Sequence, residues 1–217
     1  MEKSLSVSAV KGYRSTVSTT LRLVGNYEPS WDNLLGAVIR IMSVERPRKV
    51  SHSPRWDLSV VLRALHSPPF EPLANADLKS LTLKTVFLVA LATAQRRSEI
   101  HAIAFDRVFF NEGGEAILGS VPGFMATNQA ALTSRRPVVI PSLSRTVSRD
   151  LPDRMLCPVR ALRFYTDRTK TPAVRLGRKR LFVSYQQGFS KEIAAATISR
   201  WIVSTIKLAY TMTGKSE

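Results

Sequence analysis

The sequence is short of acidic residues, and this shortage is its most informative gap. Its 217 residues include 16 Asp and Glu against 32 Lys and Arg, so the formal net charge is +16 and the isoelectric point is near 10.8. Solubility alone does not require such an excess, which instead predicts a polyanionic partner. Most of the cations are arginines, whose planar guanidinium can hold two phosphate oxygens at once. Composition therefore favours a nucleic-acid partner, and a ribosomal-type protein or a merely basic surface is the alternative.

Cysteine and histidine are also scarce. The chain has one cysteine, Cys157, and three scattered histidines, His52, His66 and His101. A single cysteine excludes an internal disulfide framework, and the histidines have no spacing suited to a zinc site. We therefore expect no metal and no cofactor, and a reducing compartment.

No hydrophobic run is long enough to suggest a membrane span. The longest apolar stretch, from Leu81 to Ala94, contains Lys84 and ends against Arg96 and Arg97, so it is too short and too charged to cross a bilayer. The first residues lack the apolar core of a signal peptide. We expect a soluble protein with no membrane partner and no small-molecule substrate.

Apolar periodicity predicts two helices near the start of the chain. Ser8 is the expected N-cap of the first helix, and Gly25 is its expected stop. The second helix is expected from about residue 31 to residue 44, and its predicted buried side is formed by Leu34, Leu35, Val38 and Met42.

Residues 45–55 are basic and interrupted by proline, which predicts a linker. An ordinary long loop is the alternative. The predicted domains are therefore a partial helical domain at 1–44, a basic linker at 45–55 and a larger domain at 56–217.

The larger domain is predicted to be mostly helical, with one region of short strands. Expected helices begin at Asp57, at Asp77 and at Ser98, the last one ending at Ala104. The hydrophobic period then changes, which predicts a hairpin with strands at 108–110 and 116–118 and a third strand at 137–140. Two more helices are expected, one from Pro158 and one at 194–212. The predicted fold class is α+β, mainly α, with a small antiparallel sheet.

The segment from Ala92 to Ile100, A-T-A-Q-R-R-S-E-I, follows the most apolar helix of the chain. An arginine at the end of such a helix is costly to desolvate unless an anion receives it. Two interpretations follow for Arg96. It either forms a structural ion pair with Glu99, three residues later, or serves an anionic ligand.

This segment resembles the first catalytic box of the tyrosine recombinase (phage integrase) family, Ala-Thr-Gly-Leu-Arg-x-Ser-Glu-Leu. Arg96 stands at the position of the catalytic arginine, and Glu99 at that of the acidic residue that helps to orient it. Further segments are similar to the recombinases of animal retrotransposons of the DIRS and Ngaro kind, namely 6–14, 68–73, 81–92, 157–162 and 198–202. The resemblance implies a partial helical core-binding (SAM-like) lobe, followed by an incomplete catalytic lobe, which together encircle duplex DNA.

The family's chemistry is only partly represented here. In that family a tyrosine attacks the scissile phosphate, two arginines and a histidine neutralise its oxygens, and a hairpin lysine protonates the leaving oxygen. Thr127 stands at the lysine position, and no His-x-x-Arg box or later tyrosine follows the helix of Trp201 before Glu217. Tyr210 matches a core position of that helix. The missing boxes either lie downstream of this sequence or have been lost.

The resemblance predicts a DNA-binding, integrase-like protein of the nucleus that is catalytically inactive as given. Double-stranded DNA is the expected partner, and assembly into a homo-oligomer on the DNA stays open. The alternative is a basic nucleic-acid-binding or interaction module without recombinase chemistry. The resemblance implies that the leading helix usual in this lobe is missing, which would leave an apolar face uncovered. The residues expected to contact DNA are Lys11, Arg14, Arg46, Arg48, Lys49, Arg55 and Thr127.

Overall fold

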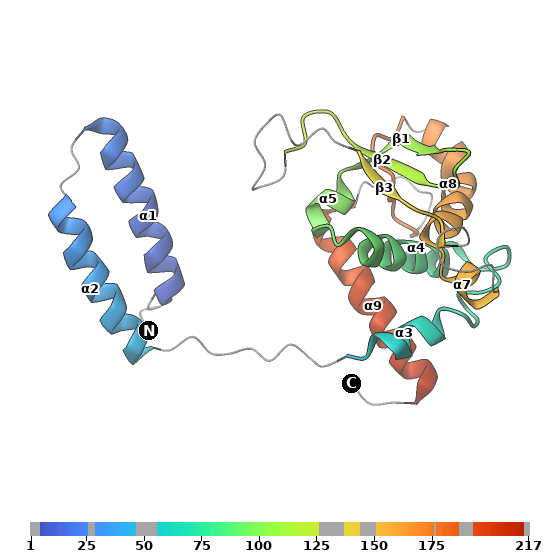
Figure 1. The fold of residues 1–217 in the computed structure, drawn as a ribbon, viewed down its shortest axis with the longest axis horizontal. Coiled ribbons are helices and arrows are strands. Elements are labelled where there is room, and N and C mark those ends of the chain that lie inside the picture. Colours follow the sequence, from blue (N-terminus) through green and yellow to red (C-terminus); the bar gives the residue numbers. More distant parts are fainter. Residues whose placement is uncertain are drawn as a thin grey trace. The chain divides into compact units, whose positions relative to one another are not determined.

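A computed structural model describes residues 5–25, 29–46, 56–125, 137–143, 151–175, 177–186 and 193–214 (Figure 1). The chain divides into two compact units, Met1–Ser53 and Pro54–Glu217. The division lies inside the linker predicted at 45–55. The fold class of the chain is α+β, mainly α, because helices dominate both the element order and the core.

The first unit is a pair of helices, α1 (Val7–Val24) and α2 (Pro29–Glu45). The predicted stop of α1 is confirmed: Gly25 has φ 81°, a left-handed conformation that glycine adopts without steric cost. The predicted N-cap is wrong by two residues. Ser6 caps α1, since its side chain accepts a hydrogen bond from the backbone N–H of Ala9 at 3.2 Å, whereas Ser8 lies inside the first turn.

The predicted buried side of α2 is wrong. Leu34 is 68% exposed and Val38 is 45% exposed, and Leu35 is exposed as well. Ile39 is the buried hydrophobic residue of this helix among the residues described. A helix that packs against one neighbour buries only the narrow stripe facing it, and α1 is that neighbour.

The second unit is built around α4 (Leu78–Thr93). Asp77 caps this helix as predicted, and its side chain accepts a hydrogen bond from the N–H of Ser80 at 2.8 Å. The residues from 80 to 89 are buried without interruption, because α4 packs against α8 (Pro158–Arg175) and α9 (Ala195–Thr213) (Figure 1). Two shorter helices belong to the same unit: α3 (Leu58–Ala64) precedes α4 in the chain, and α7 (Leu151–Met155) precedes α8.

The sheet confirms the predicted hairpin and third strand. It has the order β1 (Ile103–Phe110), β2 (Ala116–Ser120) and β3 (Val138–Ile140), with both pairings antiparallel. One face of the sheet packs on the helical core through side chains such as Leu118 and Ile140.

The short helix α5 (Arg97–His101) differs from its prediction. Its N-cap residue is Arg96 instead of Ser98, and it ends before Ala104 because the chain has by then entered β1. Ile103 already pairs with Ser120 across the sheet. Within the part of the chain that the structure describes, no helix combines the length and the apolarity that crossing a membrane needs.

Candidate nucleic-acid interface

Arg96 lies where the buried helix α4 ends and the chain turns toward solvent. Ala94 closes α4 in a left-handed conformation, φ 51°, and its N–H donates to the carbonyl oxygen of Ala90 at 3.0 Å. The chain then becomes extended at Arg96, and the side chains of Arg96 and Arg97 are exposed. Arg96 is therefore at the surface, because the left-handed break directs the chain out of the core.

Glu99 holds the main chain at Arg96. Its Oε2 atom accepts a hydrogen bond from the backbone N–H of Arg96 at 2.7 Å. An acidic residue at this third helical position satisfies a donor that a short helix leaves unbonded. Glu99 therefore orients Arg96 through the backbone, which is a structural role that does not need an ion pair.

The rest of α5 is anchored to the core. Ile100 is buried, and the His101 ring Nε2 lies 2.6 Å from the carbonyl oxygen of Ile193, in the segment before α9. The helix also packs against α9. The two arginines at the start of α5 thus stand on a firm support while their side chains face water.

Of the residues expected to contact DNA in the first unit, Lys11 and Arg46 are exposed. Arg14 is half-buried, and its Nη2 atom bonds Asp32 at 2.7 Å to Oδ1 and at 2.9 Å to the backbone oxygen. Asp32 therefore occupies part of the donor capacity of Arg14. Lys11 and Arg14 line one pocket between the two helices. The other expected contacts, Arg48, Lys49, Arg55 and Thr127, lie outside the described residues.

A buried ion cluster was not foreseen from the sequence. Lys84, on α4, is fully buried, and its Nζ atom donates to Glu71 Oε1 at 2.5 Å and to the carbonyl oxygen of Leu65 at 2.7 Å. Arg160, on α8, donates to both carboxylate oxygens of Glu71, at 2.7 and 3.1 Å. The only sequence signal was the charge of Lys84 within an apolar run, which does not reveal its partners.

The cluster ties three parts of the second unit together. Burial raises the pKa of Glu71, but the hydrogen bonds and charges of Arg160 and Lys84 outweigh burial, so the pKa is lowered. For Lys84, burial lowers the pKa, and the hydrogen bond and negative charge of Glu71 only partly oppose this effect. Lys84 has no exposed surface and therefore offers no phosphate contact, and the cluster positions α4, α8 and the segment around Glu71.

Two tyrosines of the second unit serve its core. The Tyr210 hydroxyl accepts a hydrogen bond from the backbone N–H of Asp57 at 2.6 Å, and its side chain is largely buried, as the sequence predicted. The Tyr165 hydroxyl accepts from the N–H of Val183 at 3.1 Å, and burial raises the pKa of Tyr165. Neither hydroxyl is presented to a phosphodiester.

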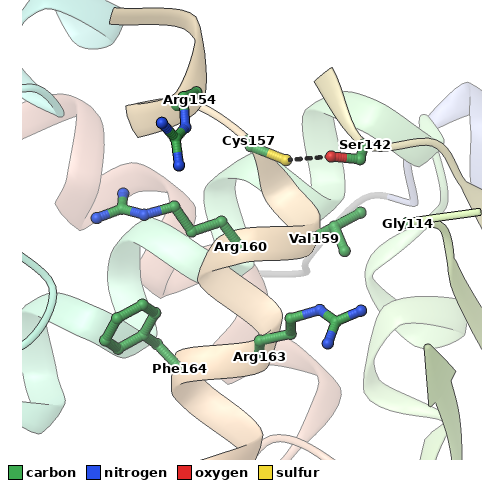
Figure 2. Close-up of a pocket in the computed structure, with 8 residues that line it drawn as sticks. All are labelled: Gly114, Ser142, Arg154, Cys157, Val159, Arg160, Arg163 and Phe164. Atoms are coloured by element: carbon green, nitrogen blue, oxygen red, sulfur yellow. Dashed lines mark hydrogen bonds between the residues drawn. The ribbon is translucent and has the colours of Figure 1, made fainter. Parts of the chain in front are cut away.

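A pocket of about 270 Å³ lies beside the start of α8 (Figure 2). The Cys157 sulfur lies 3.5 Å from the Ser142 hydroxyl oxygen. Burial raises the pKa of Cys157, but hydrogen bonds with Ser142 and with the backbone outweigh it, so the pKa is lowered. Figure 2 shows the guanidinium groups of Arg160 and Arg163 on opposite sides of the helix, so these two groups do not converge on one point. The lining residues are Gly114, Ser142, Arg154, Cys157, Val159, Arg160, Arg163 and Phe164.

Comparison with known proteins adds no family. No protein-family model matches the chain, and no curated protein matches it. In the described ranges, no group of three or more His, Cys, Asp or Glu side chains lies close enough to hold a metal ion.

Proposed function

We propose that the chain binds duplex DNA as a tyrosine-recombinase-like protein in the nucleus, and that it does not cleave DNA as the sequence stands. The observation that carries the proposal is the exposed Arg96, which begins a short helix fixed by Glu99 and by His101. A cation on such a support can meet a phosphate without prior ordering of the backbone that carries it, which lowers the entropic cost of binding. The net charge of +16 supplies the long-range attraction.

The absence of cleavage follows from the groups that recombinase chemistry needs. A covalent route requires a tyrosine hydroxyl that can reach the phosphate. The hydroxyls of Tyr165 and Tyr210 are bonded to backbone N–H groups inside the unit. By the resemblance, Thr127 stands at the position of the general-acid lysine. A threonine hydroxyl is too weak an acid to protonate the leaving oxygen in place of that lysine.

The test of DNA binding compares two exposed arginines of the second unit. Arg96→Ala should weaken binding to a labelled duplex and reduce the slope of log K against log salt by about 1, because one phosphate contact is lost. Arg63→Ala, on α3, is the matched control and should leave both quantities unchanged. Equal behaviour of the two variants in fluorescence anisotropy across a salt series would overturn the assignment of Arg96.

The test of cleavage is covalent trapping on a nicked duplex. We expect no protein–DNA adduct with the full chain, and any adduct at a tyrosine contradicts this part of the proposal. Binding and cleavage are measured separately, so one part can fail without the other.

The second candidate function is a basic interaction module without recombinase geometry. The observation that favours it is the Glu99 hydrogen bond, since capping alone explains the presence of that residue. This candidate predicts that every exposed arginine contributes equally to nucleic-acid affinity. The same salt series on Arg96→Ala and Arg63→Ala distinguishes the two candidates.

A further inference from the structure

We draw no further inference here: the strongest candidate, the exposed apolar groove between α1 and α2 in the first unit, carries nothing, because no contact within the part of the chain that the structure describes shows what covers it.

Discussion

Glu71 and Lys84 form an ion pair inside the second unit, with 2.5 Å between Oε1 and Nζ. Both side chains are almost completely removed from solvent, and Arg160 approaches the same carboxylate from α8 at 2.7 Å. Charges are expensive to bury unless each one is paired and hydrogen-bonded. The pair therefore makes folding of this unit depend on bringing α4, α8 and the segment around Glu71 together.

Loss of Glu71 should destabilise the chain strongly. Glu71→Gln leaves Lys84 without its counter-charge in a buried position, which typically costs about 3 to 5 kcal/mol. Lys84→Met should cost less, because Glu71 keeps Arg160. Urea unfolding measures both, with Glu112→Gln, an exposed residue of the hairpin turn, as the control. Equal stability of Glu71→Gln and Glu112→Gln would contradict the role of the cluster.

Glu71 should also influence how the free energy of unfolding decreases at acid pH. Because the pKa of Glu71 is lower in the folded chain than its ordinary value of 4.5, ionised Glu71 stabilises the fold above that value. This contribution is lost as the pH falls below 4.5 and through the folded pKa. The difference in unfolding free energy between wild type and Glu71→Gln should therefore shrink at acid pH. A difference that is constant between neutral pH and about pH 3 would contradict the lowered pKa.

Tyr210 should act on stability alone. Tyr210→Phe leaves the N–H of Asp57 without its acceptor, which should cost about 1 kcal/mol. Tyr13→Phe is the control, because Tyr13 is an exposed residue of the first unit and its loss of a hydroxyl should cost little. Thermal unfolding measures both variants. A Tyr210→Phe chain as stable as wild type would show that this hydrogen bond contributes nothing.

Glu99 should influence DNA affinity through the backbone of Arg96. Glu99→Ala removes the acceptor of the Arg96 N–H, so it should cost about 1 kcal/mol of stability and should also weaken duplex binding. Glu99→Gln keeps a neutral acceptor oxygen and should restore much of the stability and much of the duplex affinity. If Glu99→Ala binds the duplex as tightly as the wild type although it is less stable, the Glu99 hydrogen bond does not contribute to DNA binding.

Most elements were predictable because their signals are local. Asp57, Asp77 and Gly25 cap helices where the sequence indicates, and Pro158 begins α8. The hairpin followed from the change of hydrophobic period around the turn at 111–114. The misplaced cap of α1 arose where two residues compete for one role. Ser6 and Ser8 are both suitable caps, and only the backbone geometry distinguishes them.

The candidate interface was predictable in part. The sequence singled out Arg96 and Glu99 as neighbours and left two roles open for Arg96, an ion pair with Glu99 or contact with an anionic ligand. The exposure of Arg96 depends on the left-handed conformation of Ala94, which no side-chain pattern indicates because alanine rarely adopts it. The role of His101 depends on Ile193, which is far away in the chain and approaches only when α5 meets α9.

Composition and local pattern thus account for the strong positive charge, the helices and the small sheet, since each depends on residues close together in the chain. Tertiary packing decided which charges are buried. Lys84 lies inside because Glu71 arrives from another segment to neutralise it, whereas Arg96 lies outside because the chain turns away from the core before reaching it. The free energy of a charged side chain depends on what surrounds it in three dimensions, and neighbours in sequence do not determine those surroundings.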